Sequence, residues 1–162
     1  DRMFSMMVDD PLQRLGERDS LWVSLNAQRA LKNLDSAEKF SLGGSQGIRA
    51  YPSAEATGDS GAIFTIEHRH SLTAEWQLSP FYDQGWVRIN HDPAFPSASA
   101  LNRYSIRGWG MGLSYTKPGQ YALRLTLARR DGRNPAANKE TGGDGDGTLR
   151  ETRAWVSTVA YF

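Results

Sequence analysis

The sequence predicts an all-β protein, and two observations predict it. Apolar and polar residues alternate with a period of two along several stretches of about ten residues, as in strands with one apolar and one polar face. Short turns alternate with three long connections, at residues 33–61, 91–104 and 131–151. Strands of this length, joined alternately by short and long connections, are typical of an antiparallel transmembrane β-barrel.

The first strands are expected in the N-terminal half. Residues 1–19 are interpreted as the remnant of a preceding strand and a turn, with the strand at residues 3–8 ended by Asp9-Asp10-Pro11. Residues 21–28 and 62–69 alternate cleanly between apolar and polar side chains, which predicts two strands on either side of the first long connection.

Four more strands are expected at residues 76–90, 106–116, 123–128 and 152–162, with a turn at residues 117–120. In the second of these, aromatic and large apolar residues at odd positions alternate with a glycine column. This column either admits the close approach of another segment or marks strand curvature. Its glycines are Gly108, Gly110 and Gly112.

Composition excludes several classes of protein. The 162 residues suit one domain, and a net charge of +1 gives no reason to expect a nucleic-acid partner. No run of about 20 apolar residues predicts a transmembrane helix, although membrane strands need an apolar residue only at every second position. The absence of cysteine removes disulfide scaffolds and thiolate chemistry. We expect no cofactor, no metal and no enzymatic activity.

A soluble β-sandwich would alternate in the same way. Two features favour the membrane barrel: charged polar faces with little sign of a second apolar sheet, and aromatic residues near strand ends and on outward faces, as in interfacial girdles. The polar positions are Gln28, Arg69, Arg88 and Arg124, and the aromatic positions are Trp76, Tyr82, Trp86, Tyr115, Tyr121 and Trp155.

The connection at residues 33–61 contains five glycines, one arginine and no apolar periodicity. Connections of this length are usually functional. Its arginine, Arg49, lies in the run Gly-Ile-Arg-Ala-Tyr-Pro. Gly47, like Gly43 and Gly44, is expected to allow backbone angles closed to other residues, while Pro52 biases Tyr51 toward an extended conformation.

This connection resembles part of the C-terminal barrel of two-partner secretion transporters, the hemolysin activation/secretion proteins of ShlB/FhaC/HecB type. The resemblance lies in Asn-Leu-Asp-Ser-Ala-Glu-Lys-Phe, Leu-Gly-Gly, Gly-Ile-Arg-Ala-Tyr-Pro and Gly-Asp-Ser-Gly, followed by Phe81-Tyr-Asp83-Gln-Gly85. It implies about the last six strands of a sixteen-stranded barrel, with POTRA domains upstream and residues 33–61 folded back into the lumen. Residues 1–162 would then be the C-terminal part of a larger chain.

The resemblance also implies roles for individual residues. Phe81, Asp83 and Gly85 share one strand face, which the family turns toward the lumen. Asp83 is then the expected partner of Arg49 in a bidentate contact, with Glu67 as a second candidate and Gly85 leaving room for the loop backbone. The terminal Phe162 fits an assembly signal of outer-membrane strands.

Three motifs suggest other chemistry. The run Gly58-Asp-Ser-Gly61 resembles a serine-protease segment but has no upstream base, so a loop end is expected. His68 and His70 could form half of a metal site, although interfacial histidines are the simpler interpretation. Calcium binding would need more ligands than Asp144 and Asp146, so we expect a flexible extracellular loop there.

The sequence therefore predicts an outer-membrane translocase that secretes and activates a large partner protein of hemolysin or adhesin type. Outer-membrane lipid and the barrel assembly machinery would be its other partners. Two alternatives stay open from the sequence: an assembly insertase of the same superfamily, and a soluble β-sheet binding module or barrel enzyme.

Overall fold

The computed structural model describes residues 3–10, 17–94 and 101–161, with backbone only for residues 3–10. Every regular element in these ranges is a strand, which confirms the all-β antiparallel prediction. The strands are β1 (Met3–Asp10), β2 (Asp19–Ala30), β3 (Phe40–Ser41), β4 (Thr57–Gly58), β5 (Ser60–Ser71), β6 (Trp76–Arg88), β7 (Arg103–Lys117), β8 (Tyr121–Arg130) and β9 (Thr152–Ala160).

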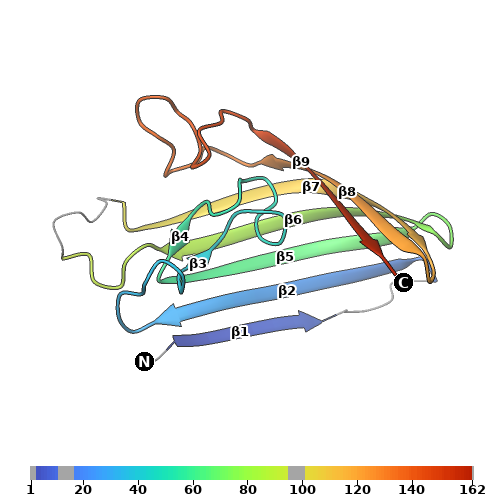
Figure 1. Ribbon diagram of the computed structural model, residues 1–162, viewed down its shortest axis with the longest axis horizontal. Helices are drawn as coiled ribbons and strands as arrows, with labels where there is room; N and C mark the ends of the chain where they lie inside the picture. Colours follow the sequence, from blue (N-terminus) through green and yellow to red (C-terminus); the bar gives the residue numbers. More distant parts are fainter. Residues whose placement is uncertain (1–2, 11–16, 95–100, 162) are drawn as a thin grey trace.

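Seven strands form one antiparallel sheet in the order β1-β2-β5-β6-β7-β8-β9, and β3 pairs only with β4. The sheet curves, so that β9 runs obliquely across the direction of the middle strands (Figure 1). β1 and β9 are the two edges of this sheet, and the described residues therefore form an open, curved wall.

The structure differs slightly from the expected strand ends. The expected N-terminal strand at residues 3–8 is present as β1, but it pairs with β2 from Met3 to Asp10, so Asp9 and Asp10 belong to the strand and do not end it. The last strand ends at Ala160, and the expected assembly signal, Phe162, lies outside the described residues.

The long connections gather at one end of the sheet, and the short turns lie at the other (Figure 1). In outer-membrane barrels the long connections are extracellular and the short turns periplasmic. Within the part of the chain that the structure describes, no helix is long and apolar enough to span a membrane.

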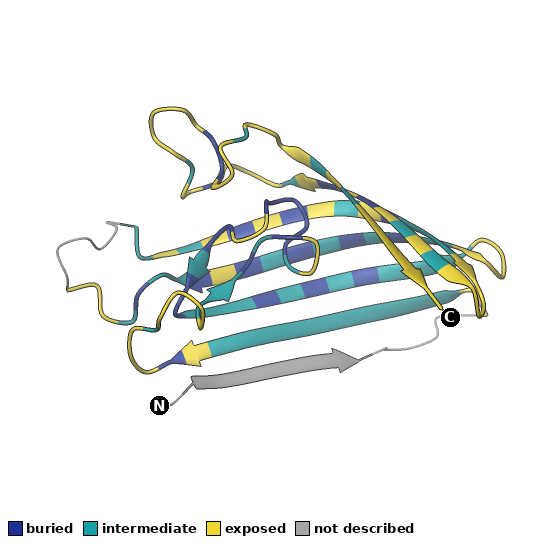
Figure 2. Ribbon diagram, in the orientation of Figure 1, coloured by how far each residue is buried: buried dark blue, intermediate teal, exposed yellow. Residues whose placement is uncertain are grey.

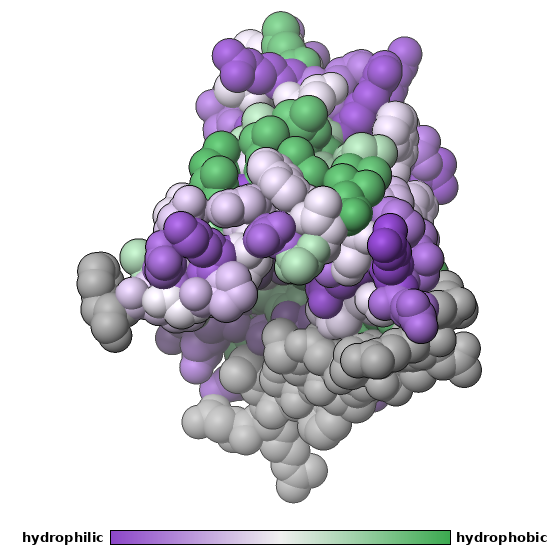
Figure 3. Space-filling view, turned by 90° about the vertical axis from the view of Figure 1, so that its right-hand side faces the viewer, coloured by the Kyte–Doolittle hydropathy of each residue, from purple (hydrophilic) through white to green (hydrophobic). Residues whose placement is uncertain are grey.

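Strand alternation separates the sheet into two faces. On the apolar face, Leu113 lies opposite Leu125, which lies opposite Val156. Leu125 and Val156 are 40% and 69% exposed. Exposed apolar side chains are unfavourable in water but favourable against lipid. Viewed end-on, hydrophobic side chains gather in a patch with hydrophilic groups on either side (Figure 3).

Aromatic side chains border the apolar face. Near the short turns, the ring centroid of Tyr115 lies 4.9 Å from that of Trp76 and 5.9 Å from that of Tyr121. Trp86 and Trp109 are exposed nearer the long connections. Aromatic residues at both borders of an apolar band are typical of membrane interfaces.

Two side chains lie on faces other than the expected ones. Trp155 alternates with Val156 and points to the opposite, charged face, where its indole binds the arginine loop. Arg88 shares its face with Trp86, so it lies on the apolar side.

The buried core lies between the charged face and residues 33–61, here called the arginine loop. Leu42, Ile48 and Tyr51 of this loop are fully buried, and parts of the loop are dark blue in Figure 2. They pack against sheet residues of β5, β6, β7 and β8: Ile63, Phe81, Val87, Ile106 and Ala128. The loop thus adds its apolar side chains to those of the sheet face.

Candidate functional site

Close backbone approaches shape the arginine loop. A Cβ placed on Gly47 would lie 2.1 Å from the carbonyl oxygen of Leu42, and one on Gly43 would lie 2.2 Å from that of Pro52. The amide of Ile48 donates to the Leu42 carbonyl at 2.7 Å and closes the turn. Of the three glycines expected to need unusual backbone angles, only Gly44 has a positive φ, +114°, whereas Gly43 and Gly47 are needed for space.

Tyr51 and Pro52 form the buried exit from the loop tip. The Tyr51 amide donates to the carbonyl of Ile48 at 3.1 Å, and the Pro52 carbonyl accepts from the amide of Glu55 at 3.2 Å. The Tyr51 ring is fully buried, and burial raises the pKa of its phenol to about 12. The phenol therefore stays neutral over the physiological range.

Arg49 at the loop tip binds Asp83 through three nitrogens. Its Nε lies 2.9 Å from Oδ2 and its Nη2 lies 2.8 Å from Oδ1, a bidentate contact, while its backbone amide donates to Oδ2 at 3.1 Å. Thr65 on β5 donates its hydroxyl to Oδ1 at 3.0 Å. Asp83 is fully buried, so these donors replace the water that its carboxylate loses.

Glu67 gathers three arginines around one carboxylate. Its Oε2 accepts from Nη1 of Arg49 at 2.8 Å and from Nη2 of Arg124 at 2.9 Å, and its Oε1 accepts from Nε of Arg69 at 2.8 Å. The sequence suggested Glu67 as a second possible partner beside Asp83, and Arg49 contacts both carboxylates at once. β5, β6 and β8 are thereby tied to the loop.

The surroundings of Arg49 keep its charge. Burial by itself would lower its pKa, but the hydrogen bonds that it donates to Asp83 and then to Glu67 outweigh burial and raise it. The guanidinium carbon also lies 3.3 Å from the ring centroid of Phe81, which adds a cation–π contact. The buried, charged guanidinium of Arg49 therefore has one binding site, which is formed by Phe81, Asp83 and Glu67.

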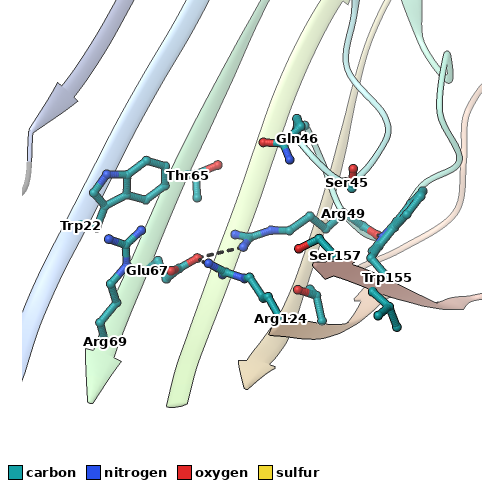
Figure 4. A pocket seen from close by; sticks show the side chains of 13 residues that line it. Trp22, Ser45, Gln46, Arg49, Thr65, Glu67, Arg69, Arg124, Trp155 and Ser157 are labelled. Atoms are coloured by element: carbon teal, nitrogen blue, oxygen red, sulfur yellow. Dashed lines mark hydrogen bonds and ion pairs between the residues drawn. The ribbon is translucent and has the colours of Figure 1, made fainter. Parts of the chain in front are cut away.

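A polar cavity of about 320 Å³ borders this binding site for Arg49. Figure 4 shows Arg49, Arg69 and Arg124 converging on Glu67. Trp155 on β9 donates its indole N–H to the backbone carbonyl of Arg49 at 2.7 Å and lines the cavity from the other side. Sequence reasoning missed this residue because it assigned Trp155 to an outer girdle.

Glycines on the strands make room for the loop. A Cβ on Gly85 would lie 2.5 Å from Cδ1 of Ile48, so Gly85 accommodates loop side chains and not the loop backbone that was expected. A Cβ on Gly108 would lie 2.4 Å from the Cβ of Ala50. Of the two interpretations of the glycine column, close approach of the loop therefore applies at Gly108.

The run Gly58–Gly61, which resembles a serine-protease segment, fixes both ends of the arginine loop. Asp59 is fully buried; its carboxylate accepts backbone amides from Leu34 at 3.2 Å and His91 at 2.7 Å, and pairs with Nζ of Lys39 at 3.2 Å. Ser60 accepts a hydrogen bond from the amide of Ala30 at 3.0 Å. These contacts join both ends of the loop to the β6–β7 connection.

The connection between β8 and β9, where the sequence suggested a flexible loop, contacts the arginine loop around Asp144. Asp144 is buried and pairs with Arg130 at 3.0 Å and Arg153 at 3.2 Å. Glu55 of the arginine loop accepts from Nδ2 of Asn134 at 2.9 Å and from the amide of Gly145 at 2.7 Å. Arginines therefore balance the charge of Asp144, whereas Glu55 is held by neutral amide donors.

His68 and His70 share a carboxylate. Oδ1 of Asp19 lies 3.0 Å from Nε2 of His68 and 2.7 Å from Nδ1 of His70, at the short-turn end of the apolar face. No group of three or more potential ligands in the described part of the chain is arranged to hold a metal ion.

An antiparallel wall with an apolar outer face, aromatic borders and a charged inner face is the architecture of outer-membrane β-barrel proteins. The chain belongs to the haemolysin secretion/activation protein family ShlB/FhaC/HecB, whose pattern matches residues 4–115. This family serves two-partner secretion at the outer membrane of Gram-negative bacteria, and the protein is therefore an outer-membrane protein.

Among curated proteins, the chain is similar to the heme/hemopexin transporter protein HuxB of Haemophilus influenzae strain 86-028NP, with 31% identity over 111 residues. HuxB of strain ATCC 51907 has the same identity over the same length. The match covers 66% of this chain and 20% of each relative, so the chain spans about a fifth of their length. No solved structure matches.

Proposed function

We propose that this chain is the C-terminal part of a barrel that secretes and activates a large partner protein across the outer membrane. The arginine loop would lie in the lumen of that barrel. The observation that carries the proposal is the contact of Arg49 with both Asp83 and Glu67 on the charged face. A loop held by a buried, charge-assisted contact keeps one conformation beside the conduit.

The remaining barrel wall would come from the rest of a longer chain. The sheet has two open edges, β1 and β9, and unpaired backbone groups are costly in hydrocarbon. Because the matched region covers only 20% of the relatives, further strands would close these edges into the sixteen-stranded barrel. The barrel assembly machinery would insert it into outer-membrane lipid.

The exported partner would be an exoprotein of the hemolysin or adhesin class. The family description names haemolysin secretion and activation, and the relatives are named as heme/hemopexin transporters. The charged face offers an unfolded chain a polar surface around the cavity of about 320 Å³.

The test is secretion by the full-length transporter carrying Arg49→Glu, Asp83→Arg or both. Each single change places like charges together in a buried site, so secreted partner should fall by at least about tenfold relative to the amount of barrel in the outer membrane. The double change restores opposite charges at the two positions and should recover part of the secretion.

Arg133→Glu is the matched control, because Arg133 is exposed in the β8–β9 connection and undergoes the same charge reversal. It should secrete like the unaltered transporter. Secretion at the unaltered level by both single variants would contradict the proposal, because the loop would then work without its anchor.

A further inference from the structure

Three arginines lie in one row across the apolar face, at the end where the long connections gather. In the strand register Ser60 lies opposite Arg88, and Arg88 lies opposite Arg103. The amide of Ala30 donates to Oγ of Ser60 at 3.0 Å, which places Arg29 beside Ser60. With strands about 4.8 Å apart, the row from Arg29 to Arg103 spans about 15 Å.

This row is a concentration of positive charge that has no carboxylate partner in the described part of the chain. Like charges directly opposite each other on neighbouring strands are destabilising. Among the described residues, no carboxylate pairs with Arg29, Arg88 or Arg103. Arg88 donates from Nε to the Asn90 carbonyl at 3.2 Å and from Nη2 to that of His91, and neutral carbonyls leave its net charge in place.

The three arginines line a groove of about 580 Å³ that also has an apolar wall. Trp86, which is 46% exposed, lies opposite Ala62. This pair is two residues along the strands from the arginine row, toward the middle of the apolar face. No aspartate or glutamate of the described residues lines the groove. The site therefore combines guanidinium groups on the long-connection side with apolar surface on the membrane side.

We propose that this groove binds the phosphorylated headgroup of an outer-leaflet lipid. Guanidinium groups match phosphate oxygens with paired N–H donors, and arginine side chains reach from an apolar surface to the interface. An acyl chain of the same lipid would lie along Ala62 and Trp86. Three cations over about 15 Å suit a headgroup with more than one phosphate. The proposal rests on the outer-membrane location and not on secretion.

The test uses the full-length transporter, purified in a neutral detergent, and titration with a diphosphorylated glycolipid (lipid A). The variant is Arg29→Gln with Arg103→Gln, because Arg88 also holds the carbonyls of Asn90 and His91. The charge-matched control is Lys117→Gln with Arg133→Gln. Lys117 is on the same face at the short-turn end, and Arg133 lies in the β8–β9 connection.

Loss of two phosphate contacts should weaken lipid A binding by at least about tenfold, whereas the control should bind within about twofold of the unaltered protein. Heat-modifiable gel mobility shows that both variants are folded. The dephosphorylated glycolipid should bind the unaltered protein as weakly as lipid A binds the variant.

Two results would overturn the proposal. Equal lipid A affinity of the double variant and the control would show that the arginine row does not bind the headgroup. Full displacement of lipid A by millimolar inorganic phosphate would show a site for free phosphate, without the contribution from the apolar wall that the proposal requires.

Discussion

Trp155 on β9 donates its indole N–H to the backbone carbonyl of Arg49 at 2.7 Å, although 106 positions separate the two residues in the chain. The guanidinium of the same arginine binds β5 and β6 through Glu67 and Asp83. One loop residue therefore joins the middle of the sheet to its edge strand. The curvature of the sheet brings these elements together, and the loop tip lies between them.

Trp155→Phe should loosen the loop from β9 without disturbing the contact between Arg49 and Asp83. The change removes one hydrogen bond to a shielded carbonyl, worth about 1–2 kcal/mol of unfolding free energy. The midpoint of heat-dependent gel mobility of the full-length protein measures the effect. Trp109→Phe, on the exposed apolar face, is the control and should leave the midpoint nearly unchanged. Equal midpoints for both variants would contradict a role for the indole contact.

Asp83→Asn should destabilise the protein far more than Thr65→Val. The first change leaves the buried Arg49 with one carboxylate partner in place of two, at a cost of about 3–5 kcal/mol. The second removes only one hydroxyl donor from Asp83, at a cost of about 1 kcal/mol. Urea unfolding in detergent micelles measures both values, and similar costs would show that the charge of Asp83 contributes little.

Gly85→Ala and Ile48→Val should compensate each other. A Cβ at position 85 would meet Cδ1 of Ile48 at 2.5 Å, and valine lacks that atom. Each single change should cost about 1 kcal/mol or more, through overpacking in one case and a cavity in the other. A double-mutant cycle measures the coupling, and the double variant should be more stable than the sum of the single costs. Strict additivity would mean that the loop moves away from Gly85.

Alkaline pH should destabilise the protein through Tyr51. Burial raises the pKa of its phenol from 10.0 to about 12 in the folded state. The stabilising contribution of the neutral phenol is therefore complete below pH 10 and is lost as pH rises toward and through 12. The difference in tyrosinate absorbance between the unaltered protein and Tyr51→Phe isolates this titration. A Tyr51 component that titrates near pH 10 in the folded protein would contradict the prediction.

The fold class could be predicted from the sequence because strand alternation is a local property. A period of two assigns each residue to one of two faces, and the β2, β5, β6, β7 and β8 strands all lie within a few residues of their expected positions. The prediction failed at Trp155, where the expected aromatic girdle was given more weight than the alternation with Val156. Aromatic residues occur on both faces, so residue type alone did not decide.

The candidate site was predictable in part. Arg49 and Asp83 could be named from two motifs, and the structure brings their side chains together. Glu67 as a centre for three arginines, and Glu55 as the contact with the β8–β9 connection, were not predictable, because each depends on segments that only the folded sheet places side by side. No local pattern around Asn134 or Gly145 signals a contact with Glu55, which lies 79 and 90 positions away.

The sequence by itself determined the strands, their two faces and the glycine-rich loop with its single arginine, because these follow from local alternation and local backbone freedom. Only the tertiary structure decided how Arg49 is shared among Asp83, Glu67 and Trp155. The physical reason is that a buried charge must collect all of its partners at once. Those partners come from three strands whose relative positions depend on the curvature of the sheet.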